Sequence, residues 1–450
     1  MASKVIPQHK CFFIQTPRRP DAQTPRRPID LNNEASVMPR YSINASRLNQ
    51  TLEELGHLGD SPGGMDRVAY SPEDIAGRDY TIKLMQQAGL DTRIDTAGNI
   101  IGRRAGSEDQ RPAIALGSHT DTVPKGGKYD GALGVMAAIE VVLTLKDQGH
   151  QTRHPLEVIS FTNEEGTRFH RWLVGSRSMS GLLEQDDLDA KDDNGHGLGP
   201  CLADIGGDIS RIGEAVRSPG ELAAYFELHI EQGPYLYQSG TPIGVVTGIT
   251  GRAVFEVEIE GKANHAGTTP MSTRRDALVS AAKLVLAVQK MAAEQEICRV
   301  STVGSIKAIP NAVNVIPGSA SIGLEFRDTD MQALAAAEHE LRRITDQTAV
   351  DDGVDVAVHR HRFTSSVPIT PEMQALVAEA SVNCGFDWEP LPSGAGHDAQ
   401  AIAAIAPVAM VFVPSVDGIS HSQEEYSTPE DCANGAQVLL ELLLLADDRF

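Results

Sequence analysis

Short apolar runs alternate with longer amphipathic stretches over much of the chain. Ile114, Ala115 and Leu116 form a continuous apolar run, which is typical of a strand buried on both faces. Further strands are predicted at 93–104, 156–162 and 408–413. Helices are predicted around Leu48, Leu52 and Leu55, from Pro72 to Gly89, at 131–147 and 371–383, from Asp398, and at 429–446. This alternation predicts an α/β fold with a mostly parallel sheet and helices on its faces.

The pattern changes near Gly248. Residues 255–260 alternate strictly between apolar and acidic side chains, as a half-exposed antiparallel strand does. The segments that follow are predicted as a helix at 276–294, strands at 299–308 and 319–327, a helix at 331–346 and a strand at 353–360. That order closes as a small two-layer α+β domain. We therefore expect residues 249–365 to form a domain inserted into a larger one, which residues 41–248 and 366–450 build together.

Two segments lack this periodicity. Residues 1–40 contain the sequence Gln-Thr-Pro-Arg-Arg-Pro twice, at 15–20 and 23–28, and few apolar positions. A Pro- and Arg-rich composition of this kind predicts a disordered leader. Residues 184–193 are acidic and are followed by turn-forming residues, so we expect a solvated loop there.

Composition narrows the classes of function. The 450 residues are 41% hydrophobic and 22% charged, and the formal net charge is −22. Nucleic acids and anionic membranes recruit basic surfaces, so we expect neither as a partner. The 5 cysteines form no Cys-x-x-Cys pair, and no apolar run is long enough for a membrane span. These features favour a globular protein of the cytoplasm.

Candidate chemistry follows the predicted strands. His119 and Asp121 come at the end of the apolar run 113–117, where open α/β sheets place ligand sites. Asp130 precedes the helix at 131–147, and Glu164 and Glu165 follow the strand at 156–162. Adjacent carboxylates repel each other unless a cation lies between them, so a metal would account for the pair. A polar surface loop and an exposed acidic pair remain the alternatives for these motifs taken singly.

Two more histidines complete the pattern. His229 lies in an extended segment ending in Glu231, Gln232 and Gly233, and His421 follows the strand at 408–413. Taken alone, His229 is more readily a structural histidine than a ligand. Together with Asp130 and Glu165, however, the three histidines supply five nitrogen and oxygen ligands at strand and helix ends, a set suited to two divalent ions that share one carboxylate.

The motifs resemble those of a known family. They are Gly117-Ser118-His119-Thr120-Asp121-Thr122, Gly126-Gly127-Lys128-Tyr129-Asp130-Gly131, Asn163-Glu164-Glu165-Gly166-Thr167-Arg168-Phe169, Glu227-Leu228-His229-Ile230-Glu231-Gln232-Gly233, Gly394-Ala395-Gly396-His397-Asp398-Ala399 and Ser420-His421-Ser422. From about residue 41 onward the chain resembles the M20 metallopeptidase superfamily, in its hydantoinase/carbamoylase amidase branch. That branch contains N-carbamoyl-L-amino-acid hydrolases, allantoate amidohydrolases and β-ureidopropionases.

The resemblance implies a role for each ligand residue. His119 and His229 would hold one metal, Glu165 and His421 the other, and Asp130 would bridge the two. Asp121 would orient His119, and Glu164 would be the general base for the bridging water. Zinc, manganese, cobalt and nickel all suit such ligands.

The inserted domain would supply further residues, again by resemblance. The segment 262–270 is similar to the family's lid motif, in which His265 would stabilise the oxyanion. Asn314 and Arg327 would bind the substrate carboxylate together with Gln232 and the turn Gly394, Ala395 and Gly396. The family also uses this domain as a homodimer interface, so some lid residues would act on the partner's site.

The expected activity is hydrolysis of the ureido C–N bond of N-carbamoyl-L-amino acids. Allantoate and N-carbamoyl-β-alanine are alternatives, because all three are small ureido carboxylates that the same metals and the same arginine would serve. A binding protein that has lost its chemistry is the remaining alternative. The intact ligand set and Glu164 argue against it.

Overall fold

The computed structural model describes residues 39–450. The predicted disordered leader therefore lies almost entirely outside the described residues. Within residues 39–450, no helix combines the length and the apolar content that crossing a bilayer requires.

The larger of the two main sheets has nine strands, in the order β15-β8-β17-β7-β5-β6-β4-β3, with β16 paired to β8. Their bounds are β3 (Asp91–Ile94), β4 (Ile100–Arg104), β5 (Ala113–His119), β6 (Leu156–Phe161), β7 (Leu222–Ile230), β8 (Ile243–Ile249), β15 (Val367–Pro368), β16 (Trp388–Ser393) and β17 (Val408–Val413). The central strands β17, β7, β5 and β6 pair in parallel, whereas β3, β4 and β15 are antiparallel to their neighbours. The mostly parallel sheet expected from the sequence is confirmed at its centre.

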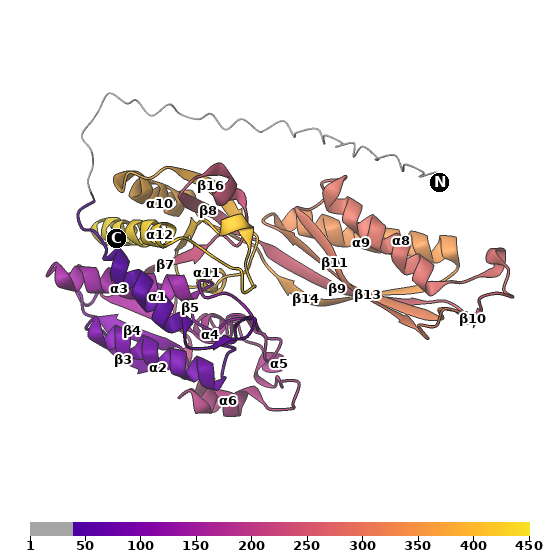
Figure 1. Ribbon diagram of the computed structural model, residues 1–450, viewed down its shortest axis with the longest axis horizontal. Coiled ribbons are helices and arrows are strands. Elements are labelled where there is room, and N and C mark those ends of the chain that lie inside the picture. Colours follow the sequence, from indigo (N-terminus) through magenta and orange to yellow (C-terminus); the bar gives the residue numbers. More distant parts are fainter. Residues whose placement is uncertain (1–38) are drawn as a thin grey trace, which may run out of the picture. The chain divides into compact units, whose positions relative to one another are not determined.

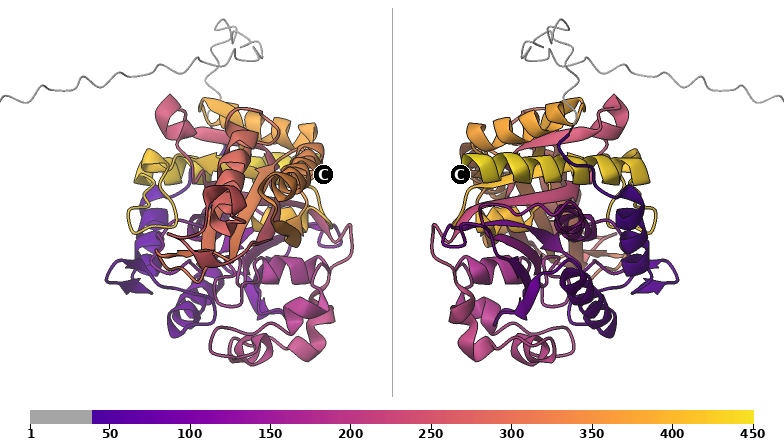
Figure 2. Two further views of the ribbon diagram at one scale, coloured as in Figure 1. Left: turned by 90° about the vertical axis from the view of Figure 1, so that its right-hand side faces the viewer. Right: turned by 90° about the vertical axis from the view of Figure 1, so that its left-hand side faces the viewer.

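Helices cover this sheet. Their bounds are α1 (Ala45–Gly56), α2 (Pro72–Gln87), α3 (Ala132–Asp147), α4 (Val174–Met179), α10 (Pro371–Asn383), α11 (Asp398–Ile402) and α12 (Pro429–Arg449). α1, α3 and α12 contact one another, and α3 and α12 also contact the central strands (Figures 1 and 2). Helices α2, α10 and α12 begin alike, because Ser71, Thr370 and Thr428 cap their first turns and a proline occupies the first helical position.

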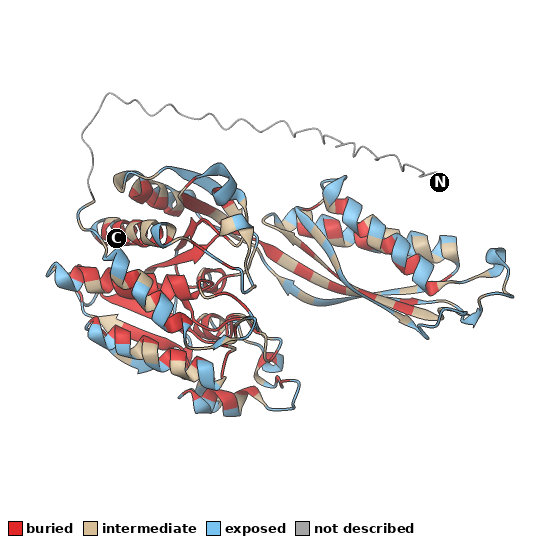
Figure 3. Cartoon of the chain, in the orientation of Figure 1, coloured by how far each residue is buried: buried red, intermediate tan, exposed pale blue. Residues whose placement is uncertain are grey.

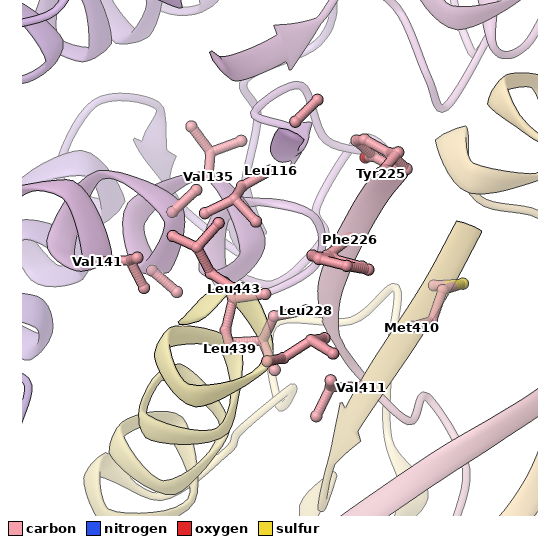
Figure 4. Close-up of a cluster of buried hydrophobic side chains, with 14 of the residues drawn as sticks. Leu116, Val135, Val141, Tyr225, Phe226, Leu228, Met410, Val411, Leu439 and Leu443 are labelled. Atoms are coloured by element: carbon pink, nitrogen blue, oxygen red, sulfur yellow. The ribbon is translucent and has the colours of Figure 1, made fainter. Parts of the chain in front are cut away.

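The core of this part lies between the sheet and α3 and α12. Leu116 of β5 and Phe226 and Leu228 of β7 meet Val135 of α3 and Leu439 of α12 (Figure 4). All but three residues of α3 are buried. The strands beneath are buried on both faces, which explains why their sequences are continuously apolar rather than alternating (Figure 3).

Residues 251–364 form a second, four-stranded antiparallel sheet in the order β11-β13-β9-β14. Its strands are β9 (Gly251–Glu260), β11 (Val300–Ile309), β13 (Ser319–Asp328) and β14 (Asp355–Thr364), and α8 (Ala277–Ala293) and α9 (Met331–Asp352) pack on one face. In β9, Ala253, Phe255 and Val257 are buried beneath the helices, while the intervening residues face away from them (Figure 3). A short antiparallel ribbon of β10 (Asn264–His265) and β12 (Val315–Ile316) extends from this sheet.

Some elements differ from those expected. β8 and β16 were not anticipated, because glycines interrupt the apolar residues of β8 and β16 contains Pro390 and Pro392. Proline is tolerated in β16 because this strand pairs with β8 alone. The predicted loop 184–193 contains the one-turn helix α5 (Gln185–Leu188), closed by reciprocal hydrogen bonds between Glu184 and Asp187. The remaining short elements are β1 (Asp60–Ser61), β2 (Gly64–Met65), α6 (Leu198–Asp204), α7 (Tyr235–Ser239) and the 3-10 helices η1 (Ile209–Ala215), η2 (Met271–Thr273) and η3 (Val416–Gly418).

Candidate active site

The sheet brings the predicted ligands together at one edge. His119 is the last residue of β5 and His229 the penultimate residue of β7. Because β5 and β7 are parallel neighbours, both side chains emerge at the carboxyl edge. Asp130 directly precedes the N-cap of α3, and Glu165 follows β6. All five predicted ligands fall into two groups, His119–Asp130–His229 and Asp130–Glu165–His421, in which Asp130 is common to both.

The distances centre on the Asp130 carboxylate. Its Oδ1 lies 3.5 Å from Nε2 of His119 and 3.2 Å from Nε2 of His229. Its Oδ2 lies 3.2 Å from Nε2 of His421, which in turn is 3.6 Å from Oε2 of Glu165. Although burial alone would raise it, the pKa of Asp130 is held well below its usual range by hydrogen bonds from the three imidazoles. The carboxylate is therefore ionised and available as a ligand.

These residues fit divalent ions. Two ligand atoms, each about 2.1 Å from a tetrahedral ion, lie roughly 3.4 Å apart, close to the separations seen around Asp130. Oε1 of Glu165 is buried without a hydrogen-bond partner, as a carboxylate oxygen reserved for a cation would be. Burial and the nearby Asp130 raise the pKa of Glu165 to about 8. A cation beside Glu165 would offset this shift and keep its carboxylate ionised.

Two acids outside the ligand groups, Asp121 and Glu425, accept hydrogen bonds from the backbone beside the predicted ligands. Nδ1 of His119 lies 2.9 Å from the main-chain carbonyl of Asp121 and 3.8 Å from its carboxylate. The Asp121 carboxylate instead accepts the backbone N–H groups of Glu164 and Glu165, at 3.1 and 3.2 Å. Asp121 thus contacts His119 through its main chain and positions Glu164 and Glu165 through its side chain.

Glu425 plays a similar part on the other side of Asp130. Its carboxylate accepts the backbone N–H of Tyr129, Asp130 and His421, and the hydroxyl of Ser420. Glu425 was not predicted from the sequence, because it lies in a run of polar residues after His421. Glu425 is buried, and its contacts with the backbone around Asp130 are evident only in three dimensions.

Glu164 lies beside the ligands. Its Oε2 is 3.7 Å from Nε2 of His119. Burial raises the pKa of Glu164 well above its usual range, although His119 opposes that shift. A buried carboxyl of this kind takes up a proton readily, which is the property that a general base requires.

A cavity of about 190 Å³ opens onto the ligands. It is lined by His119, Val123, Asp130, Glu164, Glu165, Trp172, His229, Gln232, Arg252, Arg327, Ala395, Gly396 and His421. A second cavity of about 440 Å³ shares Gln232, Arg327, Ala395 and His421 with it and adds Gly394. The structure thus brings Gln232, Arg327 and the turn 394–396 to the ligand cluster, as expected for a substrate site.

Gln232 and Arg327 are positioned by hydrogen bonds. Nε2 of Gln232 donates to Oδ2 of Asp130 at 2.6 Å, while its Oε1 is buried without a partner. Nη1 of Arg327 donates to the carbonyl of Gly394 at 2.8 Å and thereby links β13 to the turn before α11. Both side chains carry polar groups into the cavity within reach of a bound molecule.

His265 and Asn314 are not brought to this cavity within the single chain. Both are exposed at the β10–β12 ribbon, where the backbone N–H of Ala266 donates to the carbonyl of Asn314. Nδ1 of His265 accepts the N–H groups of Gly267 and Thr268. The ribbon extends from the second sheet, and neither side chain lines either cavity beside the ligands.

Comparison with known proteins shows which family the chain belongs to. A family model described as peptidase family M20/M25/M40 matches residues 115–445, more than half of its length. The chain belongs to this family. Within it, the chain is 39% identical to the N-carbamoyl-L-amino acid amidohydrolase of Geobacillus stearothermophilus, over 88% of this chain and 97% of the relative. It is 37% identical to the ureidoglycolate hydrolase of Arabidopsis thaliana, over 88% of this chain and 86% of the relative.

A solved structure agrees with these relatives. The hydantoinase/carbamoylase family amidase from Burkholderia multivorans superposes with a TM-score of 0.81 at 38% identity, covering 91% of this chain and 99% of that one. The predicted membership of the M20 family's hydantoinase/carbamoylase branch is confirmed. The protein is a metal-dependent amidohydrolase that acts on carbon–nitrogen bonds other than peptide bonds.

Several residues of this M20 site were not anticipated from the sequence. Trp172 and Arg252 line the cavity but lie outside the motifs used above. His397 lies in one of those motifs, and its ring packs edge-on against His229 at 4.5 Å while its Nε2 shares a hydrogen bond with Ser393. Burial, followed by the proximity of His229, holds the pKa of His397 well below its usual range, so this imidazole is neutral.

Proposed function

We propose that this M20 enzyme hydrolyses the ureido C–N bond of N-carbamoyl-L-amino acids, with two divalent ions among zinc, manganese, cobalt and nickel. The observation that carries the proposal is the cavity itself. Asp130 is shared by two ligand groups, Glu164 lies beside them, and Arg327 reaches the same space. A ureido carboxylate is a small molecule with a scissile carbonyl at one end and an anion at the other, which matches these two features.

The residues divide the work. His119 and His229 would hold one ion, Glu165 and His421 the other, with Asp130 between them. Two ions held by these residues would polarise the ureido carbonyl and lower the pKa of a nearby water. Glu164 accepts the proton of the attacking water and returns it to the amino-acid nitrogen as the C–N bond breaks. The carbamate released with the amine decomposes to CO₂ and ammonia.

Substrate orientation would come from the other end of the cavity. The planar guanidinium of Arg327, released from the carbonyl of Gly394, suits a bidentate contact with the substrate carboxylate. Gln232 and the backbone of Gly394, Ala395 and Gly396 lie beside it. Allantoate and N-carbamoyl-β-alanine remain alternatives, because each also joins a ureido group to a carboxylate.

Dimerisation through the inserted domain completes the proposal. β11 is an edge strand of the second sheet, and its Ile306 and Ile309 are exposed, as is Leu286 on α8. Exposed apolar edges of this kind are suited to a partner strand. In such a dimer, His265 and Asn314 would reach the partner's site. There His265 would stabilise the oxyanion and Asn314 would bind the substrate carboxylate. Light scattering should show a dimer, and Ile309→Asp should shift it toward the monomer.

A cytoplasmic location remains part of the proposal, since the four cysteines within residues 39–450 are all free thiols.

Glu164→Gln tests the chemistry. The variant should retain metal, measured by elemental analysis, because Glu164 belongs to neither ligand group. Ammonia release from N-carbamoyl-L-amino acids should fall at least about 100-fold, since general-base catalysis is worth about that much or more. Activity close to that of the wild type would refute the role of Glu164, and strong turnover of allantoate alone would replace the proposed substrate.

A further inference from the structure

Two arginines of the second sheet face the catalytic cavity side by side. Arg252 of β9 and Arg327 of β13 are direct cross-strand partners, and both alternate with residues buried beneath the helices. They therefore lie on the helix-free face of the sheet. Glu325, two residues before Arg327 on the same face, accepts hydrogen bonds from Nε of both guanidinium groups. One carboxylate thus lies between two guanidinium groups, so the three side chains together carry a net positive charge.

Trp172 fixes the orientation of Arg252. The guanidinium of Arg252 lies over the indole ring at 5.0 Å from its centroid, and that of Arg362 lies over the same ring at 5.3 Å. Arg362 is itself held by a hydrogen bond to the carbonyl of His170. Arg252 uses its Nε on Glu325, which leaves the two terminal nitrogens of its planar fork for another acceptor.

The same cavity is small and poor in aliphatic side chains. Arg252 and Trp172 line the cavity of about 190 Å³ that contains the ligand cluster, and Val123 is its one branched aliphatic lining residue. An aliphatic substrate side chain placed there would cover the fork of Arg252 without offering it a hydrogen bond. Leaving such donors desolvated and unpaired is costly.

We propose that Arg252, held by Trp172 and Glu325, selects substrates whose α-substituent ends in a planar oxygen acceptor, a carboxylate or an amide-like carbonyl. This rests on the proposed ureidohydrolase function and names the substrate class within it. Arg327 takes the α-carboxylate, and Arg252 takes the second acceptor. N-carbamoyl derivatives of acidic and amide amino acids belong to this class.

Three substrates of nearly equal size test the inference. N-carbamoyl-L-aspartate, N-carbamoyl-L-asparagine and N-carbamoyl-L-leucine differ mainly in the polarity of the side-chain end. For the wild-type holoenzyme we expect kcat/KM for the aspartate and asparagine derivatives to exceed that for the leucine derivative by about 10-fold to 100-fold, as for a polar site offered an apolar side chain. In Arg252→Met this ratio should fall at least about 10-fold, and in Arg252→Lys, which keeps the charge but not the fork, by an intermediate amount.

Arg360 provides a matched control. It too carries a guanidinium over an aromatic ring, Phe363 at 5.1 Å, and an ion pair, with Glu338 at 2.9 Å, but it does not line the catalytic cavity. Arg360→Met should leave the selectivity ratio at its wild-type value.

The outcomes separate the two proposals. If no ureido carboxylate is hydrolysed, the proposed function fails. If all three derivatives are hydrolysed but leucine is preferred, or Arg252→Met lowers all three rates equally, the function stands and the role of Arg252 is overturned.

Discussion

Gly131 offers a sharp test of the ligand cluster. It is the N-cap of α3, immediately after Asp130, and its φ is 62°. A Cβ at this position would lie 2.3 Å from Nε2 of His119 and 2.4 Å from both neighbouring ring carbons. An ordinary contact begins near 3.4 Å, so the imidazole must retreat by roughly 1 Å.

That displacement is large on the scale of metal coordination. Ligand distances are typically kept within about 0.2 Å of their ideal values, so the 1 Å shift removes His119 from the site. We expect Gly131→Ala to weaken binding of Zn²⁺ or Co²⁺ at least about 100-fold, more than is lost when an outer-shell partner is changed. At φ 62° and ψ −46° the backbone is also one that side chains rarely adopt, which costs alanine a further 1–3 kcal/mol or so of folding free energy.

Gly149 separates the two effects. It follows the other end of α3 with the same φ of 62°, and nothing lies within 4 Å of a Cβ added there. Gly149→Ala should therefore strain the backbone without displacing any neighbouring side chain. Calorimetric titration of both metal-free proteins with Co²⁺, together with urea unfolding, measures the two quantities. Equal metal affinity in Gly131→Ala and Gly149→Ala would refute the placement of His119 in the metal site.

Three further predictions concern charged and titratable side chains. Arg67 is fully buried and donates to the carbonyls of Leu55, Leu58 and Thr120, so Arg67→Met should cost about 3 kcal/mol or more in urea unfolding; a loss below about 1 kcal/mol would contradict this. The hydrogen bond between His421 and Asp130 raises the pKa of His421 to about 9. In the metal-free protein, the contribution of this bond to folding stability is therefore complete below about pH 6.5 and is lost as the pH rises through about 9. His421→Gln should remove that pH dependence, which NMR titration can follow. Burial raises the pKa of Asp74 to about 6, so stability should fall as the pH rises from about 4 to about 6, and Asp74→Asn should flatten that fall in urea midpoints.

The sequence was most informative where structure is local. His119, Asp130 and Glu165 could be placed because each adjoins an element whose apolar pattern is unmistakable, namely β5, α3 and β6. The strict alternation at 255–260 likewise predicted the second sheet.

Residues that act across long separations could not be found this way. Trp172 contacts Arg252 because the fold brings the loop after β6 next to the second sheet. No local sequence pattern around either residue indicates this contact. Glu425 supports Asp130 from 295 positions away. His265 and Asn314 show the converse, because their motifs are recognisable but the single chain leaves them outside the cavity.

The strand order also has a consequence for synthesis on the ribosome. β7, which carries His229, is flanked by β5 and β17, yet β17 is made roughly 180 residues after β7. At a translation rate of about 5–20 residues per second, one edge of β7 stays unpaired for roughly 10–40 s until β17 has been made. Over that interval the second sheet, whose strands all lie between 251 and 364, can fold ahead of the first. The apolar edge of β7 is then the surface most in need of protection by a chaperone, and His421 reaches the metal site last.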